Sequence, residues 1–161
     1  MKIAVSQCLA GEACRYDGGS KPNAAVLELV RQGEAVCICP ECLGGLPTPR
    51  EPSEIIGGEG ADVLAGRAKV LNRAGQDVSE RFIQGAYAAL AICKAQGIGY
   101  AILKARSPSC GTGKIYDGSF SGALRGGDGV TAALLKQNGI QVVTESLRPY
   151  GGQRGEKAEV L

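Results

Sequence analysis

Three cysteines lie where a parallel α/β sheet would bring their thiols together. Cys8 ends the first apolar run of the chain, Cys39 ends the second, and Cys110 follows the third across a short loop. If these runs are adjacent parallel strands, their carboxyl ends face one crevice, which is where open α/β sheets bind ligands. Three thiolates there can hold a metal ion or an iron–sulfur cluster and leave one coordination position open. An open position separates a reactive centre from a structural one.

The other cysteines fit such a centre less well. Cys37 lies inside an apolar run and Cys93 on the apolar face of an expected helix, where a cysteine usually serves as a small buried hydrophobe. Cys14 lies in the loop that follows the first run, and Cys42 closes a Cys-Pro-Glu-Cys sequence. One such pair by itself is a weak metal signal. Three roles are open for Cys42: a fourth ligand of the centre, a sulfur carrier, or a cysteine that takes no part in the chemistry. The role of Cys14 is open as well.

Acid–base chemistry in this chain must do without imidazole, since the sequence contains no histidine. That excludes Ser-His-Asp and Cys-His catalysis and leaves Glu, Asp, Lys, Tyr, Cys or water. Glu41 stands at the mouth of the expected crevice and becomes the leading general acid–base, although a loop glutamate is more often simply solvated. Lys104, Ser107 and Ser109 flank the last of the three cysteines and are placed to donate hydrogen bonds to a substrate or to sulfur.

The composition narrows the class of protein. The 161 residues carry 18 basic and 16 acidic side chains, a net charge of +2, which is too balanced for nucleic acid to be the main partner. No apolar stretch is long enough to span a bilayer, and the first residues run into strand-like sequence rather than a signal peptide. Seven cysteines without an export signal favour metal or catalytic use over a disulfide scaffold. We expect a cytoplasmic protein without nucleic-acid or membrane partners; its oligomeric state is not indicated.

The elements that must position these residues alternate along the chain. Strands are expected over 2–8, 35–39, 100–104 and 141–144, and helices over 23–32, from 77 or 79 to 97, and over 129–138 with Asp128 as the cap. This order predicts an α/β fold: a single compact Rossmann-like domain over 1–147, with a mostly parallel sheet, helices on both faces and the site at the carboxyl ends of the strands. A polar tail follows over 148–161.

Two long loops border the expected strand ends. Residues 40–78 are rich in proline and glycine, with a strand-like stretch at 68–71 that suggests a hairpin. Residues 105–127 form a second glycine-rich loop. Loops of this length inside a compact domain are usually functional. The segments 43–66 and 105–127 border the strand ends, so we expect a narrow site that suits a small flat base better than a folded tRNA.

Several motifs, taken together, connect the chain with a known family. They are Ser6–Gly11, Cys14–Gly18, Cys39–Glu41 with Gly44–Arg50, Lys104–Gly111, Ile115–Gly118 and Gly127–Leu135. On these stretches the sequence resembles a small, mostly bacterial family long described as a domain of unknown function, whose characterised members are thiouracil desulfidases. The similarity covers nearly all of residues 1–147.

The resemblance implies a cofactor and a reaction. In this family three cysteines bind a [4Fe–4S] cluster, and they match Cys8, Cys39 and Cys110 here. The fourth iron takes the sulfur of a thiolated base such as 2-thiouracil, and the products are the oxo base and sulfide without net redox change. Glu41 and a serine of the stretch 107–109 would handle protons. The substrate would be a small-molecule thiolated base.

Two other interpretations remain open from the residues alone. The first is a structural zinc site in which Cys42 joins the three cysteines and closes the coordination sphere. The second is a sulfur-binding module that carries a cluster but has no turnover.

Overall fold

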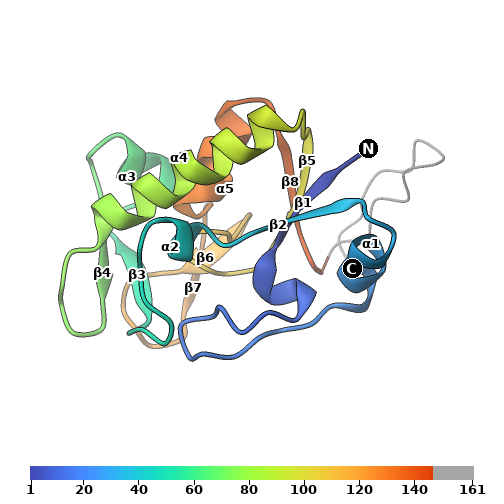
Figure 1. Ribbon diagram of the computed structural model, residues 1–161. Helices are drawn as coiled ribbons and strands as arrows, with labels where there is room; N and C mark the ends of the chain where they lie inside the picture. The colour runs from blue at the N-terminus through green and yellow to red at the C-terminus, as the bar shows by residue number, and fades with distance from the viewer. Residues whose placement is uncertain (147–161) are drawn as a thin grey trace.

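A four-stranded parallel sheet forms the centre of the computed structural model, which describes residues 1–146 (Figure 1). The strands lie side by side in the order β2 (Ala35–Ile38), β1 (Ile3–Ser6), β5 (Tyr100–Leu103) and β8 (Gln141–Thr144). Each neighbouring pair is parallel. The middle strands β1 and β5 are buried along their whole length, as the unbroken apolar runs require when helices cover both faces of a sheet.

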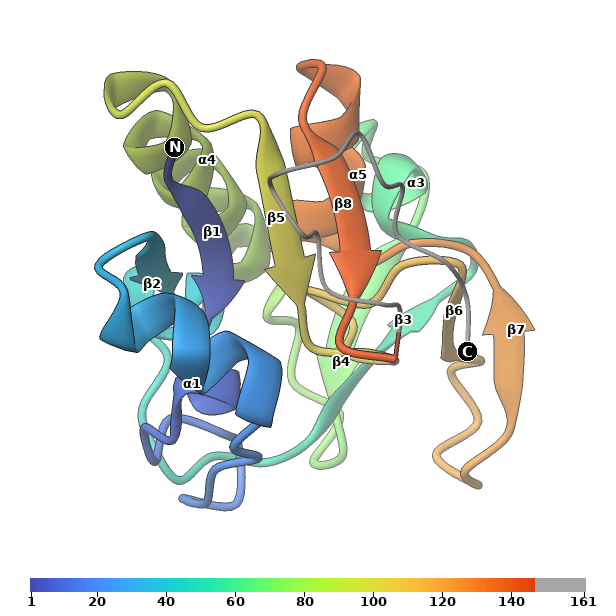
Figure 2. The same ribbon diagram turned by 90° about the vertical axis from the view of Figure 1, so that its right-hand side faces the viewer.

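Helices lie on both faces of this sheet (Figures 1 and 2). The 3₁₀ turn η1 (Gln7–Ala10) and helix α1 (Ala24–Arg31) lie on one face. Helices α4 (Ser79–Ala95) and α5 (Val130–Gln137) cover the other face. The predicted fold class, a parallel α/β sheet between helices, is therefore confirmed.

The two faces of the sheet belong to two separate apolar clusters, because alternate strand residues point in opposite directions. Toward α1 the sheet presents Ile3, Val5, Tyr100, Ile102 and Val143, which cluster with Val26 and Leu29. Toward α4 and α5 it presents Ala4, Ile38, Ala101, Leu103 and Val142, which cluster with Phe82, Ala86, Leu90 and Leu135. Burial of both clusters holds the strand ends in register beneath the loops that carry the polar residues.

The order in which successive strands are added to the sheet reverses between β1 and β5, although the strands themselves are parallel. From β1 the chain passes through α1 to β2 on one side, and the later strand β5, reached through α4, pairs on the other side of β1. A crevice opens at the carboxyl ends of the strands wherever the strand order reverses in this way. The sheet therefore offers its ligand site at the ends of β1 and β5, with the end of β2 alongside.

The long loops contain short elements of their own. The first holds α2 (Pro40–Leu43), the antiparallel hairpin of β3 (Ser53–Ile56) and β4 (Lys69–Asn72), and α3 (Gly60–Leu64); the second holds the antiparallel pair β6 (Lys114–Tyr116) and β7 (Leu124–Gly126). The strand-like stretch at 68–71 does lie in a hairpin. The other elements were not predicted, because segments of three to five residues are too short to show a periodicity.

Asp128 does not cap the last helix, which corrects the prediction. Gly129 occupies the N-cap position, and no side chain caps it. The Asp128 carboxylate instead accepts from Thr112 Oγ1 at 3.0 Å and from the Gly113 amide at 2.9 Å, and pairs with Lys136 at 3.0 Å. Burial raises the pKa of this carboxyl, but its hydrogen bonds and Lys136 lower it by more, so the pKa lies below its ordinary value. Asp128 thus ties the second long loop to α5.

Two expectations concern other parts of the chain. The polar tail expected over 148–161 lies outside the described residues. No helix within residues 1–146 has the length and apolar character needed to cross a bilayer.

Candidate functional site

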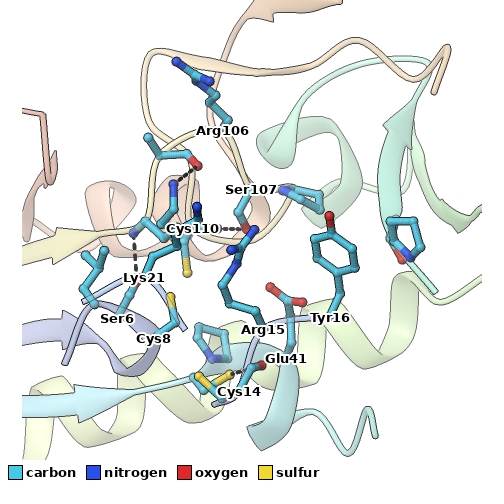
Figure 3. Close-up of a pocket in the computed structure, with 18 of the residues that line it drawn as sticks. Ser6, Cys8, Cys14, Arg15, Tyr16, Lys21, Glu41, Arg106, Ser107 and Cys110 are labelled. Carbon is cyan, nitrogen blue, oxygen red and sulfur yellow. Dashed lines mark hydrogen bonds between the residues drawn. The ribbon is translucent and has the colours of Figure 1, made fainter. Parts of the chain in front are cut away.

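A cavity of about 830 Å³ opens at the carboxyl ends of β1, β2 and β5 (Figure 3). Its lining includes Cys8, Cys39 and Cys110, each of which is less than one tenth exposed. Figure 3 shows the sulfur atoms of Cys8 and Cys110 and the carboxylate of Glu41 pointing into the same space. The structure thus brings together the three cysteines that the strand-end argument selected.

Local chain geometry places each cysteine. Cys8 sits in η1, directly after β1, and the turn ends at Gly11 in the left-handed conformation (φ 90°), which glycine adopts without strain. Cys39 follows β2, and Pro40 begins α2 immediately after it, at a position where proline is favourable. Cys110 lies in a turn held by Ser107, whose Oγ accepts from two successive backbone amides, that of Cys110 at 3.0 Å among them.

A fourth thiol lies in the same cavity. Cys14 belongs to the lining, and although Cys39 lowers the pKa of its thiol, Cys8 and burial raise it by more, to about 12. The Cys39 thiol also donates to the Cys14 carbonyl oxygen at 3.9 Å. Cys42, by contrast, is exposed, is absent from the cavity lining and has its sulfur 3.6 Å from Thr48 Oγ1. Of the two cysteines left open by the sequence, Cys14 is the one that faces the site.

Burial and neighbouring groups also raise the pKa of two other cysteine thiols at the site, Cys39 and Cys110. Burial, and next the charge of Glu41, raise the pKa of Cys110 to about 12. The hydrogen bond with Cys14, and next burial, raise the pKa of Cys39. Thiolates are the ligand form of cysteine, so a metal that binds here must displace protons from these thiols.

The donor set suits an iron–sulfur cluster better than a single zinc ion. Soft thiolates are the ligands that such clusters take, and four line this cavity. Within residues 1–146, no three Cys, Asp or Glu side chains are spaced to hold a single metal ion. One zinc would require its sulfur ligands to lie roughly 3.8 Å apart, given its bond length and tetrahedral angle. A cluster binds each cysteine at a different iron and so takes thiolates that lie further apart.

Glu41 reaches the cavity from α2. Its side chain is 18% exposed and forms an ion pair with Arg50, whose side chain is 8% exposed. Arg50 is a site residue without a sequence signal of its own beyond the Leu-Pro-Thr-Pro-Arg stretch in which it stands. A carboxylate that is oriented by a buried cation, and that faces a cavity, is placed to exchange a proton with a small molecule.

The other predicted polar residues separate into two groups. Ser107 lines the cavity. Ser109 is fully buried outside the lining, and its Oγ lies 2.8 Å from Thr131 Oγ1. Lys104 lines the cavity, but its ammonium is paired with Glu145 at 2.9 Å. Ser107 is therefore the serine that can meet a ligand, while Ser109 and Lys104 are engaged by the protein itself.

Ser6 is a site residue that sequence reasoning missed. It ends β1, is 3% exposed, and lines the cavity. Its Oγ accepts the backbone amide of Lys104 at 2.8 Å, and its hydroxyl is hydrogen-bonded to the thiol of Cys110, which lowers the pKa of that thiol against the larger effect of burial. Hydrogen bonds to cysteine sulfur are one of the means by which proteins tune iron–sulfur clusters.

Aromatic side chains form the outer wall of the cavity. Tyr16 stands beside Glu41 in Figure 3, and the guanidinium of Arg15 lies 5.6 Å from the centre of the Tyr16 ring. Phe120 lines the cavity from the second long loop, with a left-handed φ of 55°. The buried carboxylate of Glu54 holds that backbone by accepting from the Phe120 amide at 3.2 Å. Such rings offer flat apolar faces to a heterocyclic ligand.

Comparisons with known proteins agree on one family. The family model described as 2-thiouracil desulfurase matches residues 3–146. The uncharacterised protein YbbK of Bacillus subtilis (strain 168) is 51% identical over 144 residues, which are 89% of this chain and 95% of that protein. A solved structure named [4Fe–4S]-dependent thiouracil desulfidase TudS is 46% identical, with a TM-score of 0.79, and the match covers 89% of this chain and 90% of the other.

Proposed function

The chain belongs to the 2-thiouracil desulfurase family, and on this premise we propose that it removes sulfur from a thiolated pyrimidine with a [4Fe–4S] cluster held by Cys8, Cys39 and Cys110. The products are the oxo base and sulfide, and the reaction has no net redox change. The enzyme class follows from the family, and the cofactor from the name of the solved relative.

One observation carries the assignment of the ligands. Three cysteines that follow three different parallel strands line a single cavity, and a carboxylate faces the same space. The zinc interpretation grouped these three cysteines with Cys42, which is absent from the cavity lining, so that set of four does not come together here. We assign no ligand role to Cys14, the fourth thiol that does line the cavity. A site with three cysteine ligands keeps one iron open for a substrate.

The residues around the cysteines supply binding and proton transfer. When bound, the cluster supplies an iron without a protein ligand, which acts as a Lewis acid toward the soft sulfur of the substrate. Glu41 takes a proton from the water that attacks the ring carbon, because it stands two residues after Cys39 and its carboxylate faces the space into which the thiols of Cys8 and Cys110 point (Figure 3). Ser107 accepts two backbone amides through Oγ, which leaves its hydroxyl proton to donate to the substrate.

The substrate we favour is a small flat base, and neither nucleic acid nor membrane is needed as a partner. Tyr16 and Phe120 provide faces on which a heterocycle can stack. The working location we propose is the cytoplasm, because all seven cysteines are free and reduced thiols are maintained there.

The test is anaerobic loading of the protein with iron and sulfide, followed by incubation with 2-thiouracil. We expect a brown protein with broad absorption near ~400 nm and release of uracil and sulfide. Glu41→Gln should keep the cluster and lower turnover by roughly 10²–10⁴-fold, the usual contribution of a general base. Glu80→Gln, the same change on the exposed side of α4, is the control.

Labelled water separates hydrolysis from other routes. The reaction in ¹⁸O water under argon should place the label in the new carbonyl group of uracil. Unlabelled uracil, or a need for reductant in every turnover, would refute the hydrolytic route. Rapid turnover of thiolated tRNA without turnover of free bases would keep the cluster chemistry and overturn the substrate. A colourless protein that binds one zinc would overturn the cofactor.

A further inference from the structure

We propose that Arg50 is a positioning residue that holds Glu41 by one carboxylate oxygen and leaves the other free to act on water. The inference rests on the proposed function, because it takes Glu41 as the group that accepts the proton. It adds a residue that neither the sequence motifs nor the comparisons assign, and it specifies which oxygen of Glu41 does the chemistry.

The contacts of the ion pair are one-sided. Arg50 Nε donates to Glu41 Oε2 at 3.0 Å, and Arg50 Nη2 donates to the same oxygen at 2.5 Å. An arginine–carboxylate pair more often uses both oxygens, one for each donor. Here, among residues 1–146, no donor reaches Oε1 of Glu41. The pair therefore fixes the carboxylate through Oε2 and leaves Oε1 without a donor among residues 1–146.

The guanidinium of Arg50 is also held by acceptors other than Glu41. Nη2 also donates to the carbonyl oxygen of Cys14 at 3.2 Å, and Nη1 donates to the carbonyl oxygen of Pro47 at 3.1 Å and to Thr48 Oγ1 at 3.1 Å. Burial lowers the pKa of Arg50, but the charge and hydrogen bonds of Glu41 raise it by more, so the group stays a cation. These bonds hold the Arg50 guanidinium in one orientation independently of Glu41.

These bonds connect the base with the cysteines. The carbonyl that Arg50 binds belongs to Cys14, whose loop also accepts the thiol of Cys39. Arg50 therefore binds both Glu41 and the carbonyl oxygen to which the Cys39 thiol donates, and Glu41 itself stands two residues after Cys39 in the chain. One side chain thus links the carboxylate of Glu41 with the loop that contacts Cys39.

Only a guanidinium can make this set of bonds. Its planar fork points separate donors at Oε2, at the carbonyls of Cys14 and Pro47, and at Thr48. A lysine carries the same charge on one nitrogen and cannot reach acceptors that lie on opposite sides of the fork. Loss of orientation by about 1 Å costs on the order of 10²-fold in rate when a catalytic group must meet its target.

Arg50→Lys is the first test, because it keeps the charge and removes the fork. We expect iron and sulfide content per chain and KM to stay near the parent values, and kcat to fall by roughly 10–10²-fold. The matched control is Arg67→Lys, which alters an exposed arginine–carboxylate pair with Asp62 outside the cavity and should leave all of these values unchanged. Parent-like kcat in Arg50→Lys overturns the inference.

Two further measurements separate positioning from a general structural role. The double variant Arg50→Lys/Glu41→Gln should be no slower than Glu41→Gln, since Arg50 acts through Glu41; a multiplicative loss would refute this. In Arg50→Ala, free guanidinium at millimolar concentration should restore part of kcat, while methylammonium should not. Loss of the cluster without any response to guanidinium would assign Arg50 a purely structural role and overturn the inference.

The inference and the proposed function fail in different ways. If Glu41→Gln turns over at the parent rate, Glu41 is not the base and the proposed mechanism is wrong. If Glu41→Gln is inactive while Arg50→Lys is fully active, the base is right and only the positioning role of Arg50 is wrong. Thermal unfolding of the cluster-free variants gives a readout without turnover: the effects of the two substitutions on Tm should be non-additive.

Discussion

Helix α2 carries Glu41 and begins directly after Cys39, and it packs on α4 through a contact that has no room for a side chain. A Cβ atom added at Gly85 would lie 1.9 Å from the carbonyl oxygen of Pro40 and 2.8 Å from its carbonyl carbon. Both neighbouring atoms belong to the backbone, so no rotamer change can relieve the overlap. Gly85→Ala must therefore push α2 away from α4.

The size of the effect follows from two opposing terms. Alanine is favoured over glycine inside a helix by about 1 kcal/mol. Overpacking of a close contact costs about 1–3 kcal/mol, and here the Cβ would need about 1.5 Å more space to reach the 3.4 Å of an ordinary contact. Because the overlap is large and involves backbone atoms, we expect its cost to lie near the upper end, so that the free energy of unfolding falls by up to ~2 kcal/mol. A shift of α2 by about 1 Å should also lower turnover by about 10²-fold.

Denaturant unfolding of the cluster-free protein, iron content and kcat together test this reasoning. The control is Gly99→Ala, because no atom lies within 4 Å of a Cβ built at that position and its φ is not left-handed. Gly99→Ala should leave kcat unchanged. If Gly85→Ala instead gains the stability that helix propensity alone predicts and keeps the parent kcat, the contact between α2 and α4 does not set the position of Glu41.

Three further predictions concern single side chains. Cys8→Ser should strongly deplete iron and sulfide, while Cys93→Ala, which changes a fully buried thiol of the core, should leave both intact; metal analysis decides. Asp128→Asn should lower the free energy of unfolding by about 1–2 kcal/mol near pH 7. Because the pKa of Asp128 is lowered in the folded protein, its contribution is present above pH ~4 and is lost as the pH falls through the folded pKa, so parent and variant should converge in acid denaturation. Ser107→Ala should lower kcat by about 10²-fold, whereas Ser109→Ala should lower the free energy of unfolding by about 1 kcal/mol through its lost bond to Thr131, measured by denaturant unfolding.

The sequence alone was sufficient for the sheet and for the three cysteines. The strands of a parallel sheet are unbroken apolar runs, and the helices between them show a regular spacing, so both can be recognised from neighbouring residues. Once the strands are parallel, their carboxyl ends share one edge of the sheet, and residues that follow them must meet. This is why Cys8, Cys39 and Cys110 could be grouped without coordinates, and why Glu41 was found beside them.

Tertiary structure alone decided the finer roles. Ser107 and Ser109 stand two residues apart, and only the packing of α5 shows that the first faces the cavity while the second bonds to Thr131. Arg50 reaches Glu41 across nine positions of irregular chain, and Cys14 reaches Cys39 across 25. Such contacts depend on how loops without a period fold over the strand ends, and this is set by interactions between distant segments that no local pattern encodes.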